Sequence, residues 1–331
     1  MNKTNIALAG IRPTSRLHIG NYLGAVKGMI ELQEKPDFKT FYMVADLHAL
    51  TTPFNPATFS TGVKDVILDY LACGLDPKKS TIFIQSEIKE HTYIAFLLSS
   101  QVTVAKMLHL PTYKEKIKEN PKNITMCLLN YPVLMAADIL AYKATYVPVG
   151  KDQEPHMETA REITRKLNTE YGTNIPEPKT YSTTGKYIPS LTGVGKMSKS
   201  VEGSSIYLTD SKDEIVKKIS KIPTDSGMGP ELPNSGGVQT LLTLIENFVS
   251  KEERDKLEKD YLSVGLKYGQ IKQDLAQVIY EYLQPIQLKR QELQKDSAYV
   301  QNVLKEGNNK AQEVASQTLN EIKTAFGIKL I

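Results

Sequence analysis

The hydrophobic positions in the first half of the chain follow two alternating patterns. Short apolar runs at residues 6–9, 41–45, 81–85 and 146–149 end at glycine or polar residues, which is typical of buried strands. Between these runs, apolar residues recur at helical spacing, and one such helix is expected to stop near Gly74. Strands that alternate with helices predict a parallel, doubly wound α/β sheet with right-handed crossovers.

The pattern changes after residue 183. Residues 183–205 are rich in Gly, Ser, Thr and Lys and show little periodicity, so we expect a long mobile loop. Beyond this loop the strand patterns fade, and we predict a Rossmann-like domain over residues 1–204 and an α-helical domain over 205–331, whose last helix could pack back on the first domain. The segments with helical spacing are 239–249, 252–262, 267–284, 286–306 and 308–326.

Composition excludes several classes of protein. With 40% hydrophobic and 24% charged residues, the 331-residue chain can bury a sizeable core and has no mark of disorder. No segment approaches the roughly 18 apolar residues of a membrane span, and the N-terminal apolar stretch is too short for a signal peptide. Cys73 and Cys127 lie among apolar residues and are expected to be buried thiols of a reducing compartment. We therefore expect a cytoplasmic protein whose partners include neither a membrane nor DNA.

The net charge of +4 is weak support for a polyanionic partner. Its distribution says more, because the excess of Lys and Arg lies in residues 1–204, whereas residues 205–331 are close to neutral. Contacts with phosphate groups are therefore expected in the first two-thirds of the chain.

A first candidate site is the segment GIRPTSRLHIGN, residues 10–21, between the first strand and the helix that follows. Ligands of open α/β sheets bind at the carboxyl ends of strands, and a helix N-terminus favours phosphate. Gly10 and Gly20 would let a ligand approach the backbone closely. His18 and Asn21 would share one face of the first helical turn and could donate to phosphate oxygens. The alternative is a structural turn in which His18 caps the helix.

A second candidate is GKMSKS, residues 195–200, inside the expected loop. Lys196 and Lys199 are three residues apart, and they could clamp a polyphosphate as flexible point charges. The alternative is a solvated, lysine-rich loop.

Together these segments resemble the two signatures of class I aminoacyl-tRNA synthetases. HIGN is similar to the HIGH signature, KMSKS matches the second signature without a change, and their order is that of the family. The last position of the first signature is Asn, a variant seen in tryptophanyl-tRNA synthetases. Longer blocks similar to bacterial members of that family lie at 10–25, 46–52, 83–87, 131–142, 147–163, 195–200 and 274–287.

The resemblance implies a reaction. Members of the family activate L-tryptophan with ATP, release pyrophosphate and transfer tryptophan to tRNA(Trp), acting as homodimers, with Mg²⁺ accompanying ATP. His18 and Asn21 would hold ATP, while Lys196 and Lys199 neutralise the departing pyrophosphate. Arg12 and Thr112 stand where the family often has Gln, so the sequence leaves their contact with ATP open. The further ATP contacts that the resemblance implies are Gly20, Lys116, Asp152, Met197 and Ser198.

The resemblance also implies a tryptophan pocket. Asp138 would accept the indole N–H, and phenylalanine would then be rejected by about 10⁴–10⁵ because it leaves this carboxylate without a donor. Leu8 and Met135 stand where tyrosyl enzymes have Tyr and Gln, and apolar side chains there suit an indole. Since a buried carboxylate needs partners, the alternative is that Asp138 caps a helix or bonds to nearby backbone. The other implied contacts are Gly10, His48, Val147 and Val149 in the pocket wall, and Tyr131 and Gln153 at the α-amino group.

Alternatives stay open for two histidines and for the function. His48 could instead be a histidine satisfied within the core. His91, His109 and His156 show no metal-ligand spacing, and His156 is expected to pair with Asp152 or to cap the start of its helix. The rival functions are tyrosyl-tRNA synthesis, nucleotidyl transfer without tRNA, and a synthetase-like binding protein.

Overall fold

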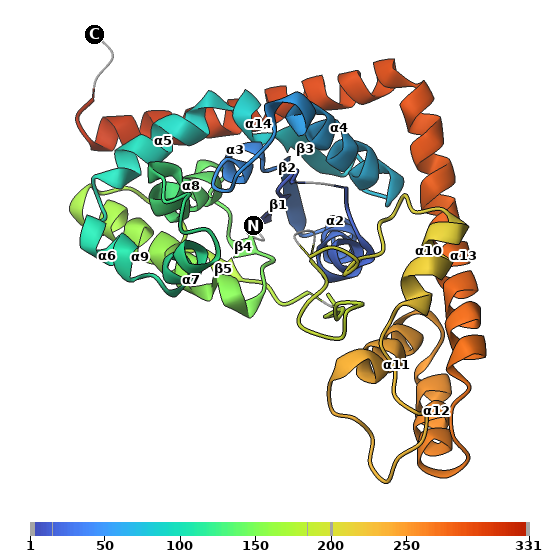
Figure 1. Ribbon diagram of the computed structural model, residues 1–331. Coiled ribbons are helices and arrows are strands. Elements are labelled where there is room, and N and C mark those ends of the chain that lie inside the picture. Colours follow the sequence, from blue (N-terminus) through green and yellow to red (C-terminus); the bar gives the residue numbers. More distant parts are fainter. Residues whose placement is uncertain (1–3, 15, 184, 199–200, 329–331) are drawn as a thin grey trace. The chain divides into compact units, whose positions relative to one another are not determined.

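The computed structural model describes residues 4–14, 16–183, 185–198 and 201–328. Within these ranges five parallel strands form one sheet in the order β3-β2-β1-β4-β5, which confirms the predicted fold class (Figure 1). The last strand was not predicted, because Lys179 and Thr180 are polar and form no apolar run. The strands are β1 (Asn5–Ile11), β2 (Phe38–Val44), β3 (Ser80–Ile84), β4 (Tyr146–Val147) and β5 (Lys179–Thr180).

The order of the strands defines the switch point of the sheet. β1 pairs with β2 along its whole length and with β4 at Ala7 and Tyr146. The chain therefore builds β2 and β3 on one side of β1 and then crosses to the other side for β4 and β5. Ligands of such sheets bind outside the carboxyl ends of the strands that flank the switch point. Here that place lies beside the ends of β1 and β4.

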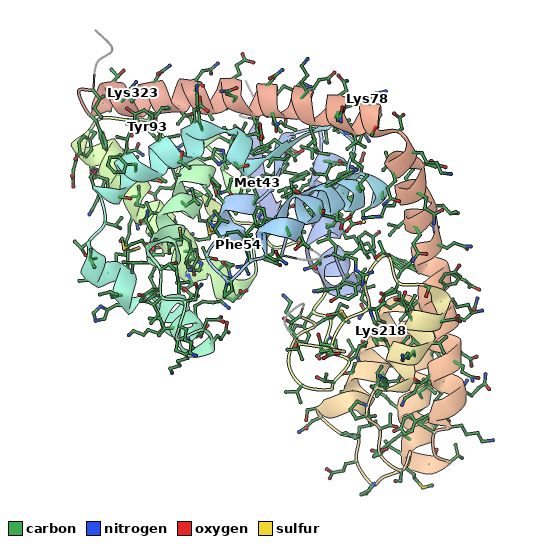
Figure 2. The ribbon with its side chains drawn as sticks, turned by 45° about the horizontal axis from the view of Figure 1, so that its top comes forward. Met43, Phe54, Lys78, Tyr93, Lys218 and Lys323 are labelled. Atoms are coloured by element: carbon green, nitrogen blue, oxygen red, sulfur yellow. The ribbon has the colours of Figure 1, made fainter. Side chains whose placement is uncertain are left out.

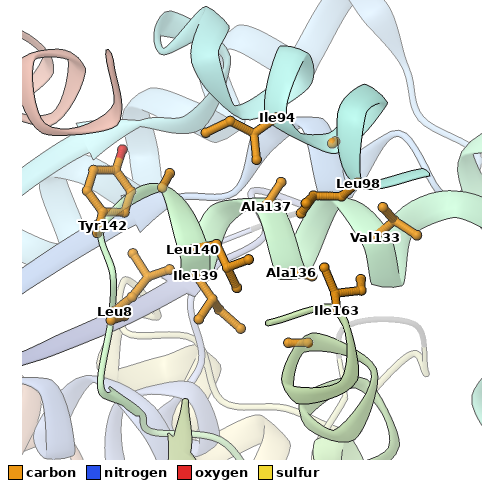
Figure 3. Packing of buried hydrophobic residues seen from close by; sticks show 14 of the residues in the cluster. Leu8, Ile94, Leu98, Val133, Ala136, Ala137, Ile139, Leu140, Tyr142 and Ile163 are labelled. Atoms are coloured by element: carbon orange, nitrogen blue, oxygen red, sulfur yellow. The ribbon is translucent and has the colours of Figure 1, made fainter. Parts of the chain in front are cut away.

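Helix α8 (Met126–Ala141) is central to the core beside the sheet. It packs between α5 (Lys89–Ser99) and α9 (Glu154–Glu170), where small side chains let the helices approach. Figure 3 shows Ala136 and Ala137 of α8 among Ile94, Leu98 and Ile163 of the neighbouring helices, all of them buried. The other elements of this half of the chain are α1 (Ile19–Asn21), the π-helical turn η1 (Tyr22–Val26), α2 (Lys27–Gln33), α3 (Asp46–Ala49), α4 (Pro56–Ala72), η2 (Gln85–Glu87), α6 (Val104–His109), α7 (Pro111–Glu119) and η3 (Lys151–Gln153).

The chain divides into two compact units. Unit 1 comprises residues 1–14, 28–183 and 296–331 and contains the sheet, and unit 2 comprises residues 15–27 and 184–295. The boundaries of these units differ from the predicted boundary at 204/205, because the HIGN segment belongs to the same unit as the chain beyond residue 183. The helices of unit 2 that follow the KMSKS segment are α10 (Lys212–Ser220), α11 (Gly236–Phe248), α12 (Lys251–Ser263) and α13 (Tyr268–Lys295).

The C-terminal helix α14 (Ser297–Ala325) belongs to unit 1 and packs on β3 and α5. A Cβ at Gly307 would meet the carbonyl oxygen of Ile82 at 1.8 Å, so glycine lets the helix backbone lie directly against the strand. The Lys323 ammonium lies 5.6 Å from the ring centroid of Tyr93 on α5 (Figure 2). The three segments expected over 267–326 thus form two long helices, α13 and α14, which are separated at Asp296.

Two expectations from composition can be compared with the structure. Cys73 is buried, which raises the pKa of its thiol well above the ordinary value. The prediction for Cys127 is wrong, because this residue is exposed. It lies in the first turn of α8, before that helix enters the core at Leu128. No helix in the described part of the chain is both long enough and apolar enough to cross a membrane.

Candidate active site

A buried carboxylate lies at the centre of the predicted amino-acid pocket in unit 1. Asp138 of α8 is 0% exposed. Its Oδ2 accepts from His48 Nε2 at 2.8 Å, its Oδ1 accepts from His91 Nδ1 at 2.7 Å, and the Gln85 amide lies 3.0 and 2.9 Å from the two oxygens. A carboxylate offers about four lone-pair positions, and here the protein fills all of them.

These partners keep Asp138 ionised. Burial alone would raise the pKa of Asp138, but the electrostatic attraction of His91 and the hydrogen bonds from His48 and His91 outweigh it and lower the pKa to about 2. The network continues outward, because His91 Nε2 lies 2.7 Å from the hydroxyl of Tyr142. Burial raises the pKa of Tyr142 far above its ordinary value, so this hydroxyl keeps its proton.

The predicted reason for rejecting phenylalanine is therefore wrong. Asp138 has donors without any substrate, and they are side chains from α3, η2 and α5 rather than the nearby backbone of the predicted alternative. An indole N–H reaches this carboxylate only by replacing one of them. The side chain of His48 is 10% exposed, whereas that of His91 is fully buried, so His48 is the partner that a ligand can reach first.

Apolar side chains surround this network. Leu8 and Val147 are buried, and Met135, Val149 and Tyr131 pack against the same core cluster. Beside them, a Cβ at Gly10 would meet Met43 Cγ at 2.7 Å, so the end of β1 has no room for a side chain.

Another buried histidine connects the residues predicted at the α-amino group. His156 Nδ1 lies 3.0 Å from Gln153 Oε1, and its Nε2 lies 2.7 Å from the hydroxyls of Tyr131 and Thr112. Burial lowers the pKa of His156 to about 4, so the ring is neutral at pH 7. Because Nδ1–H donates to the Gln153 carbonyl, Nε2 carries the single lone pair that the two hydroxyls share.

The expected pairing of His156 with Asp152 is wrong, since the Asp152 carboxylate instead accepts from Gln153 Nε2 at 2.7 Å. Sequence reasoning missed His156 as a site residue; its spacing of three from Gln153 was the available signal. Elsewhere in unit 1, Arg12 and Asp152 are exposed, and Lys116 pairs with Glu119 on its own helix, α7.

In unit 2, the first signature forms a helix cap. His18 Nδ1 accepts from the backbone N–H of Asn21 at 3.2 Å, and Asn21 Oδ1 accepts from the backbone N–H of His18 at 3.3 Å. The predicted alternative, a capping histidine, thus describes the local structure. Since Nδ1 is an acceptor, a neutral His18 carries its proton on Nε2.

The second signature lies directly against the first. A Cβ at Gly20 would lie 3.3 Å from Met197 Cβ and 2.9 Å from His18 Nδ1, so only glycine fits between them. Met197 is buried, its N–H donates to the Ile188 carbonyl at 3.0 Å, and Lys196 is exposed. Lys199, the other predicted lysine, lies outside the described residues.

The chain just beyond KMSKS also pairs with the first signature. Ile19 N–H donates to Ile206 O, and Leu208 N–H donates to Leu17 O, both at 2.9 Å. Ser198 is held to the same segment, because its carbonyl accepts from the Ser205 hydroxyl at 2.9 Å. Two motifs almost 180 residues apart in the sequence thus form one structure inside unit 2.

Comparison with known proteins identifies the family of this chain. The family model described as tRNA synthetases class I (W and Y) matches residues 1–284. A tryptophan–tRNA ligase from Porphyromonas gingivalis is 39% identical over 97% of this chain and 99% of its own length. One from Clostridium longisporum is 40% identical over 98% and 97%, respectively. The crystal structure of tryptophanyl-tRNA synthetase from Campylobacter jejuni, complexed with ADP and tryptophan, matches with a TM-score of 0.84 and 31% identity, over 97% of this chain and 99% of that one. Since these matches extend over nearly the whole of both chains, the protein belongs to the class I tRNA synthetases of the W and Y family.

Proposed function

We propose that the protein is a tryptophan–tRNA ligase. It joins L-tryptophan to the α-phosphate of ATP, releases pyrophosphate and transfers tryptophan from the adenylate to tRNA(Trp). The observation that carries this proposal is the close approach of Gly20 to Met197, which places the two synthetase signatures side by side. The chain that contains them aligns over nearly its full length with tryptophan–tRNA ligases.

Adenylate formation needs alignment of the reactants and stabilisation of charge on the leaving oxygens. His18 and Asn21 hold ATP in this proposal, and Lys196 and Lys199 neutralise pyrophosphate as it leaves. Mg²⁺ arrives with the phosphates of ATP as part of the substrate. Among the described residues, no group of three His, Cys, Asp or Glu side chains is arranged to hold a metal ion. The remaining proposed contacts of ATP are Arg12, Gly20, Lys116, Asp152, Met197 and Ser198.

Tryptophan specificity is proposed to come from an apolar pocket with one polar position. Leu8 and Met135 offer no hydrogen bond to a phenol, which favours an indole over the tyrosine ring. Asp138 accepts the indole N–H by exchange with His48, so its contribution is the difference between two hydrogen bonds rather than the full cost of an unpaired carboxylate. The other proposed contacts are Gly10, His48, Val147 and Val149 in the wall, and Tyr131 and Gln153 at the α-amino group.

A second copy of the chain is the proposed partner of unit 1. Apolar side chains are exposed on α5, on α6 and at the start of α8. Helices α6 and α8 pack against each other within this unit. Phe96 is 77% exposed, Met126 73% and Val104 64%, which favours burial against another protein. Sedimentation velocity is expected to give a dimer, and a monomer at micromolar concentration would contradict it.

The regions of the chain carry different roles in this proposal. Residues 1–204 perform the chemistry and residues 205–331 contain the anticodon-binding helices. Because the latter region is close to neutral, shape, stacking and hydrogen bonds are expected to outweigh a basic patch in tRNA recognition. Charging of tRNA takes place in the cytoplasm, which is the proposed location.

Charging assays with tRNA transcripts test the function. Tryptophan is expected to be attached to tRNA(Trp), and Lys196→Ala is expected to lower the rate by at least tenfold because it removes a charge that stabilises pyrophosphate. Attachment of tyrosine to tRNA(Tyr) would favour the tyrosyl alternative. Adenylate formation without transfer to any tRNA would favour a nucleotidyltransferase.

A further inference from the structure

Residues 274–287 form one of the blocks similar to bacterial synthetases, and the last of them, Gln287, has no role in the proposed reaction so far. Gln287 lies on α13 in unit 2, and its amide Nε2 lies 2.9 Å from the carbonyl oxygens of both Leu208 and Asp210. Leu208 and Asp210 are buried, so these carbonyls depend on a donor from the protein. Nearly 80 residues separate Gln287 from the segment that it holds.

The held segment is otherwise a tight turn. The backbone N–H of Asp210 donates to Tyr207 O at 3.2 Å, and the N–H of Tyr207 donates to Asp210 Oδ2 at 2.8 Å. Lys218 of α10, marked in Figure 2, pairs with Asp210 and lies 4.5 Å from the ring centroid of Tyr207. Helices α10 and α13 therefore bind the same turn, α10 through the ammonium of Lys218 and α13 through the amide of Gln287.

This turn leads directly to the signatures. Leu208 accepts from Gln287 through its carbonyl, and its own N–H donates to Leu17 O. Ile206 accepts from Ile19 N–H, one residue before Gly20, where an added Cβ would lie 3.3 Å from Met197 Cβ. A displacement of the turn therefore moves the backbone that carries His18, Gly20 and Asn21.

We propose that Gln287 is a positioning residue for adenylate formation. By fixing the carbonyls of Leu208 and Asp210, it fixes the pairing of 206–208 with 17–19 and thereby the geometry of the two signatures. The proposal deepens the proposed function and rests on it. The proposed tryptophan contacts all belong to unit 1, whereas His18, Gly20 and Asn21 belong to unit 2, so the effect is expected on ATP rather than on tryptophan.

Gln287→Met tests the inference, because methionine keeps the length of the side chain and removes the donor. Gln284→Met is the matched control, since Gln284 is exposed on the same helix and its side chain makes no hydrogen bond to a described residue. In ATP–pyrophosphate exchange we expect Gln287→Met to lower kcat/KM for ATP about tenfold, the size of one to two lost hydrogen bonds. Gln287→Glu is expected to lower it further, because a carboxylate faces the two carbonyls. The dissociation constant of tryptophan, measured by calorimetry, is expected to stay within about twofold of the wild type.

Two results would overturn the proposal. One is equal kcat/KM for ATP in Gln287→Met and Gln284→Met. The other is a parallel loss of ATP and tryptophan affinity, which would make Gln287 a residue of general stability. If the wild type exchanges with no amino acid, the proposed function fails separately. The inference is then decided by the ATP dissociation constant alone, where the same tenfold difference is expected.

Discussion

Replacing Asp138 by asparagine tests the network at the centre of the pocket. The substitution keeps the shape of the side chain but removes the charge and turns one oxygen into an NH₂ group. That NH₂ group then faces an N–H donor, from His48 at one oxygen position or from His91 at the other. We therefore expect Asp138→Asn to lower the free energy of unfolding at pH 7, independently of any effect on substrate.

The magnitude follows from the pKa of Asp138. The protein holds this pKa at about 2, against an ordinary value of 3.8. A depression of roughly two units corresponds to ~2–3 kcal/mol in favour of the ionised form. Because the folded-state pKa is depressed, this stabilisation is present above about pH 4 and is lost as the pH falls toward about 2. The expected loss in Asp138→Asn at pH 7 is thus ~2–3 kcal/mol.

Urea unfolding followed by circular dichroism measures the effect. Asp37→Asn is the control, because Asp37 is exposed and its carboxylate accepts one side-chain hydrogen bond, from Asn5. It is expected to change stability by less than about 0.5 kcal/mol. If Asp138→Asn were as stable as this control at pH 7, the network would not support the fold and the reasoning would be refuted.

Two further substitutions test other parts of the account. Gly307→Ala is expected to lower the free energy of unfolding by at least about 2 kcal/mol, because the added Cβ meets the Ile82 carbonyl. Gly269→Ala, which has open space around it in α13, should raise the free energy of unfolding by up to about 1 kcal/mol. Thermal melts that shift in the same direction for both variants would contradict the packing of α14 on β3. Since burial lowers the pKa of His156 to about 4, the unfolded state takes up a proton first as the pH falls from about 6.5, and wild-type stability should drop by ~3 kcal/mol by pH 4. His156→Gln should lack this part of the drop, and identical pH profiles in urea unfolding would show that His156 is not held neutral.

The sequence was sufficient for the fold because its signal is periodic. Four of the strands lie in short apolar runs, the helices after residue 205 leave helical spacing over several turns, and the structure contains them. The separation of the last two helices was not visible in this way. Gly307 suggests a break in sequence, but its missing side chain serves contact with β3, and the helix continues through it.

The site was predictable only where short motifs carry it. HIGN and KMSKS identify themselves, and their contact follows from Gly20, which lacks a side chain toward Met197. The partners of Asp138 could not be predicted, because His48, Gln85 and His91 lie 90, 53 and 47 residues away in sequence. Only the packing of α3, η2 and α5 against α8 brings them together. His156 was missed for a related reason, since its partners Tyr131 and Thr112 come from other helices.

The central claim is that this synthetase activates tryptophan, and ATP–pyrophosphate exchange measures that step directly. The assay is run with each of the twenty amino acids in turn, with wild-type protein, ATP, Mg²⁺ and labelled pyrophosphate. We predict exchange that depends on tryptophan and exceeds exchange with tyrosine by orders of magnitude. The margin over phenylalanine is expected to be smaller, because Asp138 keeps donors of its own. Exchange with tyrosine but not with tryptophan would contradict the specificity, and exchange with no amino acid would contradict the synthetase activity itself.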